Sequence, residues 1–168
     1  MKNAPKFPRF LYIPEAARQR PKRIAHKSLP WRATVYMTGL DFVLSGWCSW
    51  AKVTHVINCI GATTPEYRKA KDAEKKDVCY HSWVYKYKPH WEARYRFFHM
   101  VSLWLQDPRN VVVFHCRTGM ERAPFTLLLI MVLAFNLKKS EATTILAPHS
   151  GDPFPNIDDK RFLSSFNR

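Results

Sequence analysis

The sequence predicts an α/β fold in which helices flank a mostly parallel central sheet in three layers, preceded by a basic, non-globular N-terminal extension. Short segments rich in β-branched and aromatic residues alternate with helix-like segments, as they do in parallel sheets. Residues 125–137 are apolar on nearly all faces, which is typical of a buried central helix. A length of 168 residues suits one domain plus an extension.

The first 32 residues differ in composition from the rest. They hold nine Lys or Arg and one acid, Glu15, and so carry +8 of the net charge of +14. Five prolines and the lack of useful periodicity up to residue 30 indicate an extended, non-globular segment. We therefore divide the chain into a Pro-rich extension, residues 1–32, and a domain, residues 33–168.

The extension is a candidate binding segment. Its charge would suit a polyanion such as nucleic acid, an acidic protein surface or anionic lipid, but a targeting segment or a passive tail has the same composition. The residues expected to contact RNA or another partner are Lys2, Lys6, Arg9, Arg18, Arg20, Lys22, Arg23 and Lys27.

The strands of the domain follow from composition. They are expected at residues 34–38, 53–59, 78–85 and 111–114. A short helix or turn, interrupted at Gly46, should cover the sheet at residues 41–50. The charged segment 66–77 is expected to be a solvated helix or loop, and loops are expected at 61–65, 86–90 and 149–156.

Helices follow from hydrophobic periodicity. Residues 91–106 have helical spacing of apolar side chains, and residues 107–110 break it. Pro124 is tolerated in the first turn of the central helix. Residues 140–146 should form a further helix with Ser140 as its N-cap, and residues 158–166 a closing helix.

Bulk features exclude several classes of protein. No apolar run is long enough to span a membrane convincingly. The four cysteines form no CxxC pair or regular spacing, which argues against a zinc knuckle and a secreted disulfide scaffold. We expect no metal and no cofactor, and a reducing intracellular compartment, either the cytoplasm or the mitochondrion.

Residues 111–122, VVVFHCRTGMER, carry the clearest functional signal. A strand stops at Cys116, a tight loop contains Gly119, and a buried helix follows Arg122. Backbone N–H groups at a helix N-terminus bind the oxygens of a tetrahedral anion. The sequence therefore predicts a phosphate cup with a nucleophile at its base, lined by Arg117, Thr118, Gly119, Met120, Glu121 and Arg122.

The chemistry of this cup is that of covalent phosphoryl transfer. A helix N-terminus, loop amides and a nearby cation stabilise a thiolate, and the guanidinium of Arg122 can bind two phosphate oxygens in a fork. Attack by Cys116 on phosphorus would give a thiophosphoryl intermediate that water hydrolyses, without a metal.

The motif and its setting resemble the dual-specificity phosphatases, a family of cysteine-dependent protein tyrosine phosphatases. TVYMTG is similar to the family's first strand, and VTHVINC to the strand beside the catalytic one. The resemblance covers roughly residues 33–166. It implies a phosphatase-like fold, hydrolysis of phosphoprotein Tyr, Ser or Thr through Cys116 and Arg122, and a loop-supporting role for His115.

The chain departs from the family pattern at three places. Ala123 stands where the family carries the Ser or Thr that helps the cysteine leave. No Asp lies between Asp77 and Asp107, so only His90 and Glu92 could protonate a leaving group there. Glu92 is the candidate general acid, and an exposed acid at a helix start is the alternative interpretation of this residue. Glu121 places an acid inside the loop, which argues against highly phosphorylated lipid head groups.

Two functions therefore stay open. The first is a small phosphatase. The second is a weakly active or inactive pseudophosphatase that serves as a basic structural or binding subunit of a ribonucleoprotein, such as an organellar ribosome, or of another large assembly. Cys59 ends the strand expected beside Cys116, and in some relatives a second cysteine is a redox partner. A buried core thiol is the alternative for Cys59.

Overall fold

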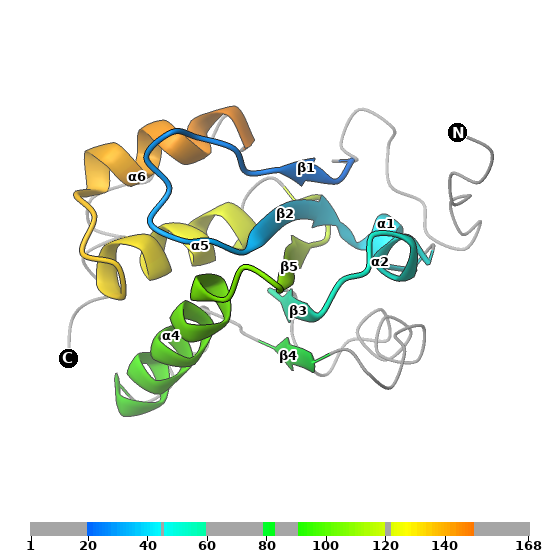
Figure 1. Cartoon of the computed structure of the whole chain (residues 1–168), viewed down its shortest axis with the longest axis horizontal. Coiled ribbons are helices and arrows are strands. Elements are labelled where there is room, and N and C mark those ends of the chain that lie inside the picture. The colour runs from blue at the N-terminus through cyan, green and yellow to red at the C-terminus, as the bar shows by residue number, and fades with distance from the viewer. Residues whose placement is uncertain (1–19, 45, 60–78, 83–90, 120–121, 150–168) are drawn as a thin grey trace.

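The computed structural model describes residues 20–44, 46–59, 79–82, 91–119 and 122–149. They form a five-stranded sheet of order β1-β2-β5-β3-β4 (Figure 1). The strands β2, β5, β3 and β4 are parallel, and β1 joins β2 antiparallel. Their bounds are Lys22–Arg23 (β1), Thr34–Gly39 (β2), His55–Asn58 (β3), Cys79–Ser82 (β4) and Val111–Cys116 (β5). The predicted mostly parallel α/β architecture is confirmed.

Helices cover both faces of the sheet. They are α1 (Leu40–Leu44), α2 (Trp47–Trp50), α4 (Trp91–Gln106), α5 (Arg122–Leu133) and α6 (Lys139–Leu146), followed by the 3-10 turn η2 (Ala147–His149). Alternate side chains of β5 enter two separate cores, because successive residues of a strand face opposite sides. Val112 and Phe114 pack with α4, α5 and α6. Val113 packs with α1 and α2.

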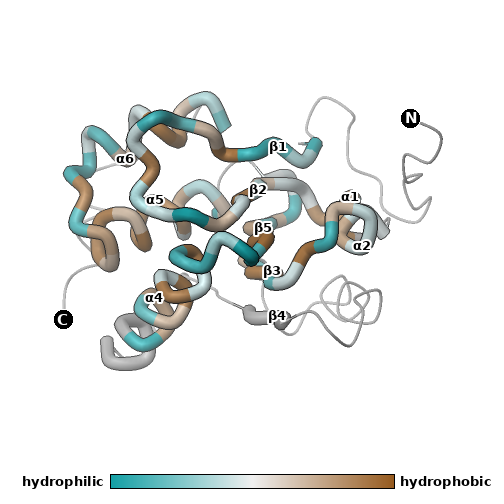
Figure 2. The backbone as a smooth tube through the Cα atoms, in the orientation of Figure 1, coloured by the Kyte–Doolittle hydropathy of each residue, from teal (hydrophilic) through white to brown (hydrophobic). Residues whose placement is uncertain are grey.

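The central helix α5 lies in the larger core. Its residues 123–131 are all buried, and hydrophobic residues concentrate on α5 and on the central strands (Figure 2). It ends at Leu133, earlier than the predicted residue 137. Asn136 has a left-handed φ of 55°, and the N–H of Leu137 donates to the carbonyl of Met131 at 3.1 Å. A residue with left-handed φ just after the last turn is a common way for a helix to end.

The predicted N-cap of α6 is wrong. The helix begins at Lys139, so Ser140 lies inside its first turn, and Lys138 is the N-cap. The Glu141 carboxylate accepts a hydrogen bond from the backbone N–H of Lys138 at 3.2 Å. An acid at the third helical position thus satisfies the backbone N–H of the N-cap residue, as it does in a capping box.

Residues 22–32 are not part of a non-globular extension, which corrects the prediction for that stretch. The N–H of Ile24 donates to the carbonyl of Val35 at 2.8 Å, and Ile24 is 1% exposed. Trp31 is also buried in the larger core. The backbone of Arg32 donates to the carbonyl of Leu105 at 2.9 Å. Residues 1–19 lie outside the described residues.

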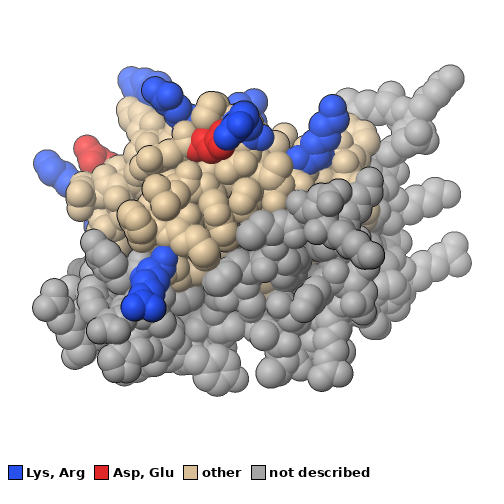
Figure 3. Space-filling model, turned by 60° about the horizontal axis from the view of Figure 1, so that its bottom comes forward, with Lys and Arg blue, Asp and Glu red and all other residues tan. Residues whose placement is uncertain are grey.

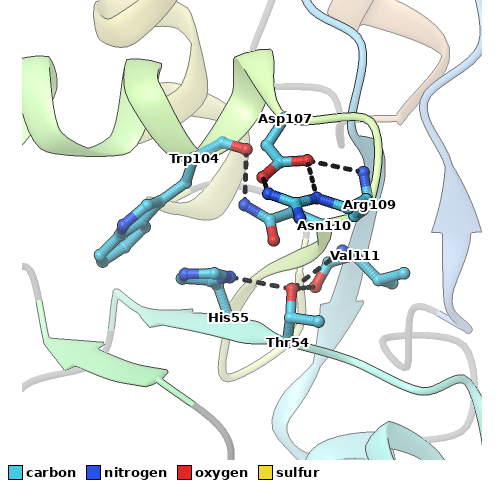
Figure 4. A network of polar contacts seen from close by, with 7 residues as sticks. All are labelled: Thr54, His55, Trp104, Asp107, Arg109, Asn110 and Val111. Atoms are coloured by element: carbon cyan, nitrogen blue, oxygen red, sulfur yellow. Dashed lines mark hydrogen bonds and ion pairs between the residues drawn. The ribbon is translucent and has the colours of Figure 1, made fainter.

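Polar contacts fix the amino end of β5 (Figure 4). The N–H of Thr54 donates to the carbonyl of Val111 at 2.9 Å, and the N–H of Val111 donates to the Thr54 hydroxyl at 2.9 Å. The side-chain amide of Asn110 donates to the carbonyl of Trp104 at 3.0 Å, which ties the end of α4 to the strand. These contacts set the register of β5 and hence where its last residue, Cys116, emerges.

Several predicted elements fall outside the described residues: the segment 66–77, the loops 61–65 and 86–90, the end of the predicted strand 78–85 beyond Ser82, most of the loop 149–156, and the helix 158–166. Among the helices that are described, none has both the length and the apolar content needed to cross a membrane.

Candidate active site

The candidate site lies at the carboxyl edge of the sheet. Strand β5 extends through His115 and ends at Cys116, two residues beyond the predicted end at Phe114. Its neighbours end at the same level, with Gly39 of β2 opposite Cys116 and Asn58 of β3 opposite His115. Helix α5 begins only six residues after Cys116. The strand, loop and helix predicted from VVVFHCRTGMER are therefore present.

The loop directs a backbone amide at the nucleophile. The N–H of Gly119 donates to the sulfur of Cys116 at 3.1 Å. Gly119 has φ of +83°, and a Cβ at this position would lie 2.6 Å from the carbonyl carbon of Thr38. Only glycine combines a left-handed backbone with this close approach, so the curl that brings the amide to the sulfur depends on it.

Strand β2 supports the other half of the loop. The N–H of Leu40 donates to the carbonyl of Arg117 at 3.1 Å. A Cβ on Gly39 would lie 3.1 Å from the same carbonyl oxygen. Sequence reasoning identified TVYMTG as a strand but missed that its last residues hold the loop. The glycine that ends the strand was the available signal.

Cys116 and Arg122 stand at the two ends of the loop. Cys116 is 2% exposed, whereas Arg122, the first residue of α5, is half-buried. The positive charge of Arg122 adds to the burial that lowers the pKa of His115, and it weakly opposes the burial that raises the pKa of Cys59. The guanidinium thus acts on groups at the ends of β3 and β5, where an anion in the cup would bind.

His115 is fully buried behind the nucleophile. Its pKa is lowered to about 4. Burial is the main cause and the charge of Arg122 adds to it, while a hydrogen bond with the backbone of Cys116 partly opposes both effects. The imidazole is therefore neutral near pH 7. A neutral, buried ring that contacts the backbone of Cys116 suits the loop-supporting role that we predict.

Cys59 lies beside the cup and is protonated. Its N–H donates to the carbonyl of His115 at 2.8 Å. Burial raises the pKa of its thiol to about 12, and the charge of Cys116 also raises it, against smaller opposite effects of Thr126 and Arg122. Cys59 and Cys116 are both free thiols here. Redox pairing between them remains a prediction.

The other predicted site residues are described only in part. Met120 and Glu121 are outside the described residues, and so is the side chain of Glu92, although its backbone lies in the first turn of α4. Thr118 is half-buried in the loop. The described residues hold no group of three or more His, Cys, Asp or Glu that could bind a metal ion.

The basic residues predicted to bind a partner are only partly described. Lys2, Lys6, Arg9 and Arg18 lie outside the described residues, while Arg20, Lys22, Arg23 and Lys27 are exposed in and around β1. In Figure 3, Lys and Arg side chains project at several separate places from a largely uncharged surface, rather than in one patch. On the face that Figure 3 shows, the described basic side chains are therefore dispersed.

Comparison with known proteins gives structural matches only. No family model matches the chain, and no curated protein sequence matches it. PTPMT1 is 15% identical, with 77% of this chain and 82% of that chain covered and a TM-score of 0.52. DUSP15 is 17% identical, with 83% of this chain and 88% of that chain covered and a TM-score of 0.51.

A third match is the PTP-2 phosphatase of Cydia pomonella, which is 15% identical over 81% of this chain and 86% of that chain, with a TM-score of 0.50. At these identities the likeness concerns the fold. It agrees with the strand, loop and helix around Cys116. The chain therefore has the fold of the dual-specificity and related cysteine-dependent phosphatases.

Proposed function

We propose that this protein hydrolyses phosphomonoesters of phosphoprotein Tyr, Ser or Thr through a covalent intermediate on Cys116. The observation that supports it is the hydrogen bond from the Gly119 N–H to the Cys116 sulfur. A preorganised backbone N–H at the nucleophile can stabilise the negative charge that the sulfur and the phosphate oxygens carry during the reaction.

The reaction requires two displacements at phosphorus. The loop amides and the fork of Arg122 hold the nonbridging oxygens while the Cys116 sulfur attacks. The S–P bond forms, the P–O bond to the substrate breaks, and an acid protonates the departing oxygen. Water then attacks the thiophosphoryl group, the S–P bond breaks, and phosphate and the thiolate are released. Glu92 stays the predicted acid.

The second displacement should be the slow one. Ala123 is fully buried at the second residue of α5 and has no hydroxyl to donate to the departing sulfur. Hydrolysis of the intermediate then relies on water alone. We therefore expect phosphorylated Cys116 to accumulate during turnover.

Serine substitution of two thiols tests the proposal. Cys116→Ser should lower the hydrolysis of an aryl phosphate by about 10³-fold or more, because a hydroxyl is a far weaker nucleophile at neutral pH. Cys48→Ser is the matched control, since Cys48 is also buried but lies in α2, which covers the opposite face of the sheet. Equal rates for wild type and Cys116→Ser would overturn the proposal.

That negative outcome would favour the second candidate, a pseudophosphatase with a structural or binding role. The buried Ala123 and the net charge of +14 support it. RNA or an acidic assembly stays the predicted partner.

Phosphoprotein is a better candidate substrate than lipid. PTPMT1, one of the structures with this fold, has been solved in complex with PI(5)P. In this chain the acidic Glu121 falls within the loop sequence. A negative charge in the loop repels lipid head groups that carry several phosphates and so opposes their binding.

A further inference from the structure

Cys59 is connected to both ends of the phosphate loop. Its backbone N–H donates to the carbonyl of His115, the residue before the nucleophile, at 2.8 Å. Its thiol is hydrogen-bonded to the side chain of Thr126. The Thr126 hydroxyl in turn donates to the carbonyl of Arg122 at 2.8 Å. The residue that directly follows β3 is thus linked to the end of β5 on one side and to the first residue of α5 on the other.

The Thr126 hydroxyl stands in apolar surroundings. Residues 123–131 of α5 are all buried, and Thr126 is the one polar residue among them. Burying a hydroxyl costs free energy unless it is hydrogen-bonded, and valine would fill nearly the same space without this cost. Thr126 and Cys59 are both 0% exposed, so bulk water cannot replace the contact between them.

The bond from Thr126 to its own helix would not by itself indicate a function. A threonine that donates to the carbonyl four residues earlier is common in helices. Thr144 of α6 makes the same bond, to the carbonyl of Ser140 at 2.9 Å, but its side chain is exposed and the bond lies within α6. Thr126 differs because its side chain is also bonded to Cys59, which lies outside its helix.

We infer that Cys59 and Thr126 form a buried positioning pair, which fixes Arg122 relative to the nucleophile and so sets the affinity of the cup for a tetrahedral oxyanion. This inference rests on the proposed function for the anion that the cup binds, but it does not depend on turnover. A guanidinium fork contacts two oxygens only in a narrow range of positions. Holding the carbonyl of the same residue restricts where that fork can lie.

The test measures the dissociation constant of tungstate, a tetrahedral dianion that stands in for phosphate, by isothermal titration calorimetry. Thr126→Val removes the hydroxyl and should raise the constant about three- to tenfold, the effect of one hydrogen bond. Thr126→Ser keeps the hydroxyl and should stay within about twofold of the wild type. Thr144→Val, the matched control, removes the same type of hydrogen bond from α6 and should leave the constant unchanged.

Cys59→Ala tests the other member of the pair and should raise the constant by a similar factor. Because the two residues act in series, the double variant Cys59→Ala/Thr126→Val should bind within about twofold of either single variant. Arg122→Gln should abolish binding, because it removes the fork. Urea unfolding of each variant separates a change in affinity from a loss of stability.

The outcomes distinguish the positioning pair from the proposed function. If Thr126→Val binds tungstate as the wild type does, or if Thr126→Ser loses as much affinity as Thr126→Val, the pair is overturned. Effects that multiply in the double variant would overturn it as well. If the variants behave as expected but the wild type does not hydrolyse an aryl phosphate, the proposed function fails and the pair stands. If Arg122→Gln binds as tightly as the wild type, the cup does not hold the anion, and both fail.

Discussion

At the scale of single residues, the cup depends on a glycine more than on any charged group that surrounds it. Gly119 adopts φ of +83°, and a Cβ at this position would lie only 2.6 Å from the carbonyl carbon of Thr38. Gly46 has nearly the same φ, +81°, but nothing lies within 4 Å of its Cβ position. Substitutions at these two glycines therefore allow the energetic cost of backbone strain to be measured separately from the cost of steric overlap.

We predict that Gly119→Ala destabilises the fold by about 2–4 kcal/mol and abolishes aryl phosphate hydrolysis, because strain and overlap add. Gly46→Ala should cost only about 1 kcal/mol, the strain alone. Urea unfolding of both variants, with activity measured on the folded protein, checks this. Similar losses of stability in the two variants would contradict the role of the Thr38 contact.

The site could be predicted from sequence only where its residues are close along the chain. Cys116, Gly119 and Arg122 lie within seven residues, and their spacing between a predicted strand and a predicted buried helix indicated a phosphate cup. The support from Thr38 and Leu40 comes from a strand almost 80 residues earlier. Which residues meet there is set by the register of β2 on β5, and no local pattern contains that information.

At the scale of elements, the start of α5 determines the second chemical step. Ala123 is the residue that follows Arg122 in that helix, and it is fully buried. A hydroxyl there could donate to the departing sulfur, as the resemblance to the dual-specificity phosphatases implies. The helix already presents this position, so a single oxygen atom is all that Ala123 lacks for this role.

We predict that Ala123→Ser raises the steady-state rate of aryl phosphate hydrolysis by about tenfold, while the burst that precedes it becomes smaller. The extra atom in a packed position should cost about 1 kcal/mol of stability. Rapid-quench kinetics measures the burst and the steady rate separately. Ala142→Ser makes the same change at a buried alanine of α6 and should alter neither phase. An unchanged steady-state rate in Ala123→Ser would mean that hydrolysis of the intermediate does not limit turnover.

Elements were predictable where a pattern repeats several times. The helix Trp91–Gln106 has the predicted bounds, because its apolar spacing spans four turns. Strand β1 was missed, since Lys22 and Arg23 are two charged residues and two residues establish no period. It exists because Ile24, the next residue, is buried in the larger core. Tertiary packing, rather than local preference, decides such short edge strands.

At the scale of the whole molecule, buried groups make stability depend on pH from both sides. Burial holds the pKa of His115 down at about 4, against 6.5 for a free histidine. It also lowers the pKa values of His55 and His149. On the alkaline side, burial raises the pKa of Cys59 from 9.0 to about 12. The folded state thus favours neutral forms of all these groups.

The sign follows from counting protons. Between pH 6.5 and 4, the unfolded chain binds a proton at His115 that the folded chain does not, so stability falls as the pH falls. A difference of 2.5 units corresponds to about 3 kcal/mol for this group. Above pH 9 the unfolded chain loses a proton that folded Cys59 keeps, and stability falls again. The folded Asp107 carboxylate, with its pKa lowered to about 2 by Arg109, stays ionised in this window, and the unfolded Asp107, with an ordinary pKa of 3.8, begins to bind a proton only near pH 4.

We predict that urea midpoints are highest between about pH 6.5 and 9 and fall steadily toward pH 4. In His115→Asn, which removes the titrating group, the slope between pH 6.5 and 4 should become clearly shallower even if the variant is less stable throughout. His99→Gln, a substitution at an exposed histidine, should keep the wild-type slope. If the slopes of wild type and His115→Asn coincide, the acid sensitivity arises elsewhere, and the buried, neutral imidazole behind Cys116 does not control it.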